Sequence, residues 1–179
     1  MTTAIHRLVR ELRAGSDLGF IARMSSGWAV MNLRQVLPGT CLLLPDPVVP
    51  ALNALAGAAR LQFLADMATL GDAVQQATDA VRINYAILGN QDPALHAHVI
   101  PRYRDELPAL ATSHPWAYDW TVAPTFDVGL HGELRDRRRA VSHGGRRLGL
   151  RDRRGRGRLL GALSRLPRTV PLDITRRPS

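Results

Sequence analysis

Apolar residues recur at helical spacing in two segments of the chain. Near the N-terminus, the pattern predicts a helix that begins at Thr2 or Thr3 and ends at Gly15. A longer helix is predicted over residues 58–81, where apolar positions lie three or four residues apart. The apolar face of the first helix consists of Ile5, Leu8, Val9 and Leu12, and that of the second of Leu61, Leu64, Met67, Leu70, Val74, Ala77 and Val81.

Short apolar runs bounded by turn residues predict five strands. They cover residues 19–24, 28–33, 40–44 and 82–88, and a fifth begins near residue 94. Turn residues separate the first three strands, and residues 45–50 contain too many prolines for an inner strand. Because short links favour antiparallel pairing, we expect an α+β fold, with an antiparallel sheet and helices packed on one side of it.

The net charge of +9 is distributed unevenly. Residues 1–128 contain nine arginines and eleven acidic residues, whereas residues 129–179 contain fifteen arginines and four acidic residues. The second part is also rich in glycine and has no consistent apolar period, which is typical of disorder. We therefore predict a folded domain over residues 1–136 and a disordered, arginine-rich tail over residues 137–179.

The tail has three interpretations. An arginine-rich arm binds nucleic-acid phosphates with a strong salt dependence, whereas a solvated run of charge needs no partner. The chain has no lysine, and its arginine and glycine run begins abruptly, as a G+C-rich gene read out of frame would give. Under this third hypothesis, a frameshift affects the residues after about Ala140.

Cysteine content and hydropathy narrow the class of protein. Cys41 is the only cysteine, so neither an internal disulfide nor a cysteine-based zinc site is expected. The most apolar segment, residues 40–59, is interrupted by Asp46 and three prolines, and arginines interrupt the apolar N-terminus. We therefore expect no membrane span and no signal peptide, and a cytoplasmic location.

The fifth strand carries the candidate chemistry. In ALHAHVIPRY, residues 94–103, His96 and His98 occupy alternate positions and therefore point to one face of the strand. Neutral imidazole is a nucleophile at neutral pH, and two such rings suit attack on a phosphate or its binding. Taken alone, the pair is also compatible with a structural role or a metal site.

The flanking residues make the pattern more specific. Together, NYAILGN and LHAHVIPR resemble the histidine triad (HIT) family, whose motif is His-φ-His-φ-His-φ-φ, commonly followed by Pro-Arg. Earlier in the chain, VMNLRQVLPGTCLLLP resembles the nucleotide-binding hairpin of that family. The resemblance covers residues 17–135. It implies a five-stranded antiparallel sheet, a nucleotide substrate and a homodimer in which two sheets join, without a cofactor or a metal.

The resemblance also implies roles for individual residues. His96 matches the nucleophile that attacks the α-phosphorus of a dinucleoside polyphosphate or a nucleoside phosphoramidate, and His98 matches the histidine that binds phosphate oxygens. Asn32 matches a ribose ligand and Asn84 a phosphate ligand. For both amides, a turn or edge-strand role is the alternative.

The chain departs from the motif at its first histidine, where it has Ala94. In the family this histidine supports the other two, so its loss leaves open a nucleotide-binding protein with weakened catalysis. The transferase branch of the family alters the third position instead, which favours a hydrolase here. The segment around His114, Trp116 and Trp120 is expected either to approach the site or to serve packing alone.

Overall fold

The computed structural model describes residues 2–16, 19–129, 132, 135 and 136. They fall in one unit of the chain, residues 1–147. The predictions for residues 137–179, namely disorder, nucleic-acid binding and a frameshift, lie outside the described residues and stay predictions.

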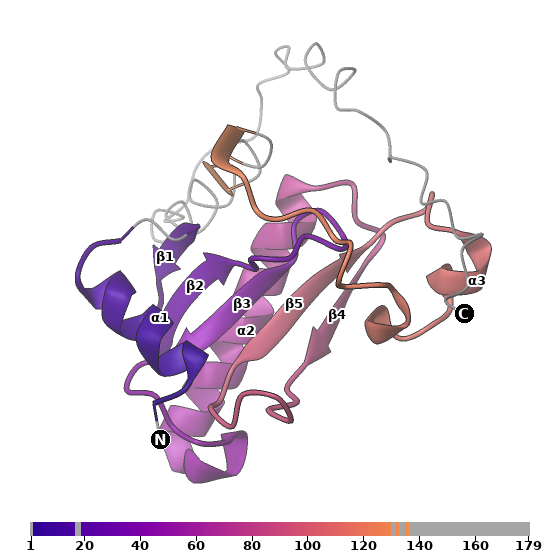
Figure 1. Ribbon diagram of the computed structural model, residues 1–179. Helices are drawn as coiled ribbons and strands as arrows, with labels where there is room; N and C mark the ends of the chain where they lie inside the picture. Colours follow the sequence, from indigo (N-terminus) through magenta and orange to yellow (C-terminus); the bar gives the residue numbers. More distant parts are fainter. Residues whose placement is uncertain (1, 17–18, 130–131, 133–134, 137–179) are drawn as a thin grey trace, which may run out of the picture. The chain divides into compact units, whose positions relative to one another are not determined.

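Five antiparallel strands form one sheet in the order β1-β2-β3-β5-β4 (Figure 1). The strands are β1 (Phe20–Arg23), β2 (Gly27–Met31), β3 (Cys41–Pro45), β4 (Arg82–Ala86) and β5 (Ala97–Arg102). Each lies within about three residues of the range predicted from the apolar runs. The fold class is therefore confirmed, and strands β1 and β4 form the two edges of the sheet.

Helix α2 (Gly57–Ala77) covers one face of the sheet. Its buried residues Phe63, Leu70 and Val74 pack with strand residues such as Leu43 and Val99. The predicted apolar face is shifted, because Leu61 is 69% exposed while Phe63 is fully buried. Phe63 and Leu70 lie seven residues apart, or two helical turns, whereas Leu61 falls outside that row.

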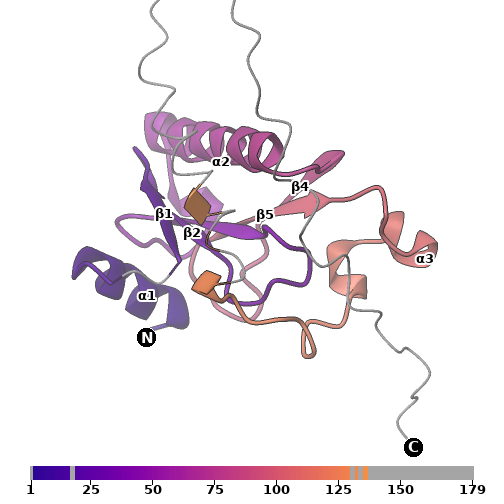
Figure 2. The same ribbon diagram turned by 90° about the horizontal axis from the view of Figure 1, so that it is seen from above.

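Helix α1 (Ala4–Arg13) lies against the opposite face, so the helices do not share one side as predicted (Figure 2). Its residues Ile5, Val9 and Leu12 form a second core cluster with Leu42 and Leu44 of β3. The reason lies in β3, which is buried at all five positions. A strand that is apolar at consecutive positions needs cover on both of its faces.

Two polar contacts attach α1. Thr3 caps its first turn, with the hydroxyl accepting from the N–H of His6. The Asp92 carboxylate accepts from the N–H of Ile5 at 3.0 Å, which ties the β4–β5 loop to the start of α1. A carboxylate satisfies a free amide there and is favoured by the helix dipole.

The remaining helices are short. They are α3 (Pro108–Ala111) and the 3-10 turns Leu52–Ala54 and Pro115–Ala117. Among the described helices, none is both long enough and apolar enough to span a membrane. The predicted cytoplasmic location stays a prediction.

The β1–β2 turn is fastened to α2 by one buried carboxylate. Asp66, 6% exposed, accepts hydrogen bonds from the N–H and the hydroxyl of Ser26, both at 2.7 Å. Beside it, a Cβ on Gly27 would lie 1.8 Å from the Leu44 carbonyl oxygen, so only glycine allows β2 to approach β3 at this point.

We expect Asp66→Ala to lower the free energy of unfolding by about 2–4 kcal/mol, because the partly buried N–H and hydroxyl of Ser26 lose their charged acceptor. Urea denaturation measures this value. Asp72→Ala, at an exposed position of the same helix, is the control and should change it by less than about 0.5 kcal/mol. Equal effects of the two substitutions would contradict the assigned role of Asp66.

Candidate functional site

The two histidines lie side by side on the face of the sheet that faces away from α2. His96 directly precedes β5, and His98 is the second residue of β5, where it pairs with Leu42 on one side and Ala86 on the other. The two ring centroids are 5.0 Å apart with an interplanar angle of 70°. Both imidazoles can therefore contact one phosphate group.

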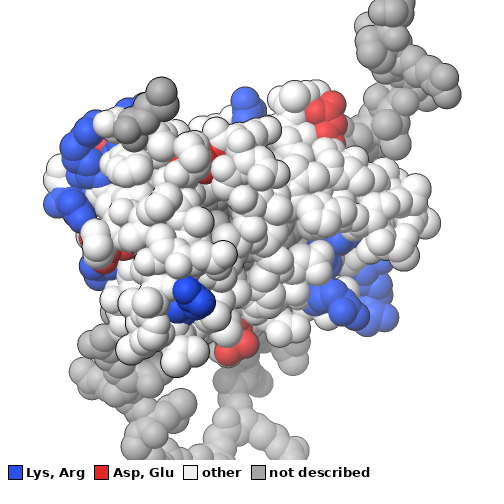
Figure 3. All heavy atoms as spheres, turned by 90° about the horizontal axis from the view of Figure 1, so that it is seen from below, with Lys and Arg blue, Asp and Glu red and all other residues white. Residues whose placement is uncertain are grey.

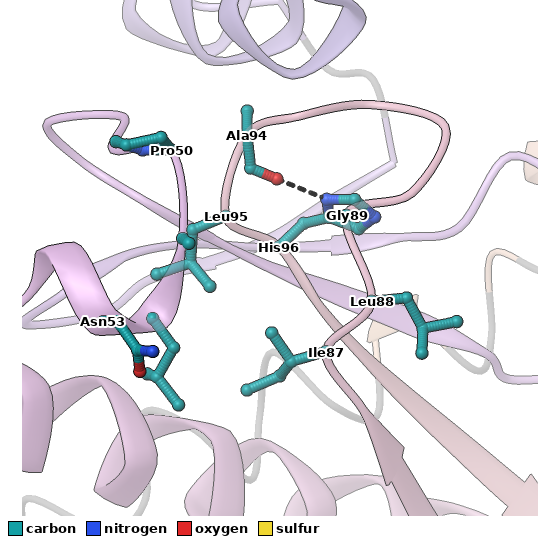
Figure 4. Close-up of a pocket in the computed structure, with 10 residues that line it drawn as sticks. Pro50, Asn53, Ile87, Leu88, Gly89, Ala94, Leu95 and His96 are labelled. Carbon is teal, nitrogen blue, oxygen red and sulfur yellow. Dashed lines mark hydrogen bonds between the residues drawn. The ribbon is translucent and has the colours of Figure 1, made fainter.

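The tautomer of His96 follows from its hydrogen bond. Its Nδ1 lies 2.8 Å from the carbonyl oxygen of Ala94 (Figure 4). A carbonyl only accepts, so Nδ1 carries the hydrogen and Nε2 of the neutral ring carries the lone pair. The backbone thus orients this ring and leaves Nε2 as the nucleophilic atom.

His98 has a different environment. Its Nδ1 is buried and has no hydrogen-bond partner among the described residues, and Trp116 and Trp120 lie against the ring at centroid distances of 5.2 and 6.5 Å. Burial, together with the neighbouring His96, lowers the pKa of His98 to about 4. His98 is therefore neutral at pH 7 in the free protein, and it can offer a phosphate a hydrogen bond rather than a charge.

Asn32 and Asn84 lie on either side of β5, one row from His98. Asn84 pairs with Ile100, and the N–H of Asn32 donates to Thr40 in the continuing register of β2 and β3. Neighbouring strands lie about 4.8 Å apart, so Asn84 on the adjacent strand β4 is about 5 Å from β5. Asn32 follows β2, two strands from β5, and is therefore about 10 Å from it. The two predicted amides and His98 therefore occupy neighbouring rows on one face.

The side chains of Asn84 and Asn32 differ in which hydrogen-bonding groups are already used. The Asn84 side-chain oxygen accepts from Arg102 at 2.9 Å, so its NH₂ group remains as a donor. The Asn32 side chain makes no hydrogen bond to the described residues. The main-chain carbonyl of Asn32 accepts a hydrogen bond from the side chain of Gln35, which is 1% exposed. The same Gln35 side chain donates to the Thr40 carbonyl and accepts from the Gly39 N–H. Gln35, which the sequence analysis missed, thus fixes the turn that presents Asn32.

Arg102 is the second residue that the sequence analysis missed. Its guanidinium is nearly buried, pairs with Glu106 at 2.7 Å, and donates to the carbonyls of Leu110, Ala111 and Ser113. Glu106 also accepts from the Tyr118 hydroxyl. This group of contacts, here called the Arg102 lock, fastens residues 106–118 to β5. The sequence feature that could have indicated it is an Arg and a Glu four residues apart at the end of the histidine strand.

The Arg102 lock places an aromatic pair over the site. Trp116 and Trp120 stack with centroids 5.4 Å apart and an interplanar angle of 25°, and both contact His98. His114 precedes this pair in the chain, and its ring centroid lies 5.0 Å from that of Trp116. Trp116 and Trp120 therefore approach His98, whereas among the described residues His114 has a ring contact with Trp116 and none with His96 or His98.

Two hollows adjoin these residues. One, of about 230 Å³, lies beside His96 and is lined by Ile87, Leu88, Asn53 and the residues around them (Figure 4). A larger one, of about 890 Å³, lies along β4 beside Trp116 and His114. Within the described part of the chain, no three His, Cys, Asp or Glu side chains gather as metal ligands would.

Residues 20–105 match the family model of the HIT domain. The chain has a HIT-like fold. This segment contains the whole sheet, helix α2 and both histidines, and thus includes the two stretches that carry the resemblance. No curated protein matches the chain significantly in sequence.

Solved HIT structures share the fold at low sequence identity. A Hit-like protein involved in cell-cycle regulation from Bartonella henselae has a TM-score of 0.59 and 17% identity, over 78% of this chain and 95% of its own. A histidine triad protein from Sinorhizobium meliloti has a TM-score of 0.58 and 21% identity, over 72% of this chain and 90% of its own. A hypothetical histidine triad nucleotide-binding protein from Sulfolobus tokodaii has a TM-score of 0.62 and 13% identity, over 80% of this chain and 96% of its own.

The Arg102 lock should be sensitive to acid. Burial alone would raise the pKa of Glu106, but hydrogen bonds from Arg102, Tyr118 and the Tyr103 N–H outweigh it and hold the pKa below its ordinary value. A carboxyl whose pKa is lowered on folding contributes stability above its unfolded pKa of about 4.3, and loses it as the pH falls through the folded value.

We expect Glu106→Gln to lower the free energy of unfolding at pH 7 by about 2–4 kcal/mol, since Arg102 keeps no charged partner in the lock. As the pH falls below about 4.3, the difference from the wild type should shrink, because the unfolded chain then takes up a proton at Glu106 that the folded protein binds less readily. Urea denaturation at pH 7 and pH 3.5 measures both values, and Glu11→Gln, at an exposed position of α1, is the control. A difference independent of pH would contradict the linkage.

Ala94 occupies the position where the motif would place an imidazole. It is fully buried in the cluster that contains Ile5 and Val9 of α1. We expect Ala94→His to lower the free energy of unfolding by about 1–3 kcal/mol through overpacking. Thermal unfolding measures the loss, and a variant of unchanged stability would contradict it.

Proposed function

We propose that the protein is a nucleotide hydrolase that cleaves at the α-phosphate of a nucleotidyl substrate through a nucleotidyl-histidine intermediate on His96. The observation that carries the proposal is the His96 hydrogen bond to the Ala94 carbonyl. It directs the lone pair of Nε2 away from the backbone and makes this imidazole ready to attack without prior loss of a proton.

The proposed reaction has two steps. The Nε2 lone pair of His96 forms a bond to the α-phosphorus, and the bond from phosphorus to the leaving group breaks. The positive charge that develops on the imidazole is stabilised by the Ala94 carbonyl, which already accepts the Nδ1 hydrogen. Water then attacks phosphorus, the electron pair of the N–P bond returns to Nε2, and a nucleoside monophosphate leaves as the proton passes to solvent.

The other site residues bind the substrate in this proposal. His98 and the free NH₂ of Asn84 donate to phosphate oxygens, and Asn32 binds the ribose from its side of β5. No cofactor or metal takes part. Trp116 and Trp120 shield the phosphates from water, which strengthens hydrogen bonds to a charged group.

Ala94 favours a second candidate, a nucleotide-binding protein whose catalysis has weakened. Loss of a residue that orients a reactive group commonly costs about 10–100-fold in metal sites. The two candidates differ in one measurement: the second binds AMP in calorimetry but shows turnover no faster than the uncatalysed reaction.

The proposed assembly is a homodimer. Strand β4 is an edge of the sheet, and Val81, Tyr85 and Leu88 at this edge are 43–52% exposed. Pairing of two β4 edges would join the sheets and cover these side chains. A nucleic-acid role rests on the tail outside the described residues. On the face shown in Figure 3, the described arginines form separate groups with uncharged surface between them.

We expect brief exposure to an adenylated substrate to add one AMP to the wild-type protein and none to His96→Ala, which should also lose steady-state AMP release by at least about 10³-fold. Intact mass spectrometry measures the adduct and peptide mapping locates it. His114→Ala is the control and should keep both the adduct and turnover. Full activity of His96→Ala would exclude the mechanism.

A further inference from the structure

His96 receives its orientation from a carbonyl that lies outside the sheet. The ladder of β5 begins at Ala97 on the side of β3 and at His98 on the side of β4. Ala94, whose carbonyl accepts the Nδ1 hydrogen of His96, precedes this strand. Strand pairing therefore does not fix the carbonyl, and its place depends on contacts of the loop between β4 and β5.

The peptide group that contains this carbonyl is held on one side by the chain that follows β3. The N–H of the same peptide group belongs to Leu95 and donates to the Val49 carbonyl at 2.7 Å. The C=O and N–H bonds of a trans peptide point in opposite directions, so this hydrogen bond directs the Ala94 carbonyl away from Val49. The group can still turn about the N–H···O axis, because a single hydrogen bond does not fix its rotation. The chain that enters the group at Ala94 therefore has to be held as well.

Helix α1 holds the entering chain through Asp92. The Oδ2 atom of Asp92 accepts from the N–H of Ile5 at 3.0 Å, across 87 residues of sequence. Its Oδ1 atom is buried and has no hydrogen-bond partner among the described residues. The helix already has a local cap in Thr3, and a contact that leaves a buried carboxylate oxygen unpaired is a costly addition to it. We therefore interpret this contact as serving the loop rather than the helix.

We infer that Asp92 is a positioning residue for the nucleophile. By attaching the loop to the first turn of α1, it holds the Ala94 carbonyl where this carbonyl accepts the Nδ1 hydrogen of His96. The inference rests on the proposed function and adds a residue to its machinery. Without the attachment, the carbonyl moves and His96 returns to the mixture of tautomers of a free imidazole, in which either nitrogen can carry the hydrogen. The fraction of the protein that has its lone pair on Nε2 then falls.

The tautomer of His96 can be observed by NMR. In protein that contains isotope-labelled histidine, two-bond nitrogen–proton spectra distinguish a protonated from an unprotonated ring nitrogen, and His96→Ala assigns the signals. At a pH of about 8.5, where free histidine with its pKa of about 6.5 is neutral, we expect a protonated Nδ1 and an unprotonated Nε2 in the wild type. In Asp92→Ala both nitrogens should shift towards the averaged values of exchanging tautomers. Asp92→Asn, whose amide oxygen can still accept from the Ile5 N–H, should keep the wild-type spectrum.

The kinetics should follow the same order. With the 4-nitrophenyl ester of AMP as substrate, we expect Asp92→Ala to lower kcat and the rate of AMP addition to His96 by about 10–100-fold, because misplacing a reacting group by about 1 Å has an effect of this size. KM should change little, since Asp92 does not contact the substrate in this proposal. Asp92→Asn should retain most of the wild-type rate.

Asp66→Ala is the matched control for a loss of stability. It also removes a carboxylate that accepts from a main-chain N–H, but at the β1–β2 turn and against α2 rather than α1. The assays are run at a temperature where urea denaturation shows that all variants are folded. Under these conditions Asp66→Ala should keep both the tautomer of His96 and the rate of AMP addition.

The outcomes separate the two proposals. An unchanged His96 tautomer and rate in Asp92→Ala would overturn the positioning role and leave the hydrolase intact. Equal losses in Asp92→Asn and Asp92→Ala, or in Asp66→Ala and Asp92→Ala, would show that the hydrogen bond to Ile5 is not the cause, and would also overturn it. A wild type with neither an AMP adduct nor turnover would overturn the hydrolase, whereas the NMR comparison would still test whether Asp92 holds the Ala94 carbonyl in place.

Discussion

The register of β5 is the constraint on which the site depends. Ala97 and Val99 are fully buried in the cluster beneath α2, and their alternation places His96 and His98 on the other face. A slip by one residue would expose Val99, at a cost of about 1.5–3 kcal/mol, and would bury two imidazoles among apolar side chains. Packing against a helix on one face thus determines the position of the chemistry on the other.

The second face is divided between two covers. Helix α1 packs over the Ala94 end of this face, and the Arg102 lock holds the aromatic segment over the opposite end. The histidines lie between them, with His96 fixed by a backbone carbonyl and His98 enclosed by two tryptophans. Two neighbouring imidazoles therefore acquire different properties: His96 is oriented by a backbone carbonyl, and the pKa of His98 is lowered by burial.

Local patterns predicted the elements more successfully than their packing. The apolar runs located all five strands, and the period of alternation placed the two histidines on one face, because both features depend on neighbouring residues alone. The side chosen by α1 and the burial of Phe63 rather than Leu61 depend on distant partners in β3 and β5. Gln35 and Arg102 were missed for the same reason, since a buried polar side chain acquires its role from carbonyls that only the fold brings near.

The backbone and the side chain of Ala94 have separate roles. The hydrogen bond that orients His96 is accepted by the Ala94 carbonyl, which every residue type would provide at this position. The side chain at the same position serves a different purpose, packing in the cluster beneath α1. Asp92, two residues earlier, accepts a hydrogen bond from the first turn of this helix. The loop that contains the Ala94 carbonyl is therefore attached to α1 both by this bond and by the packing of the Ala94 side chain. The orientation of His96 therefore does not depend on the side chain at position 94, because the hydrogen bond that sets it is made by the main chain.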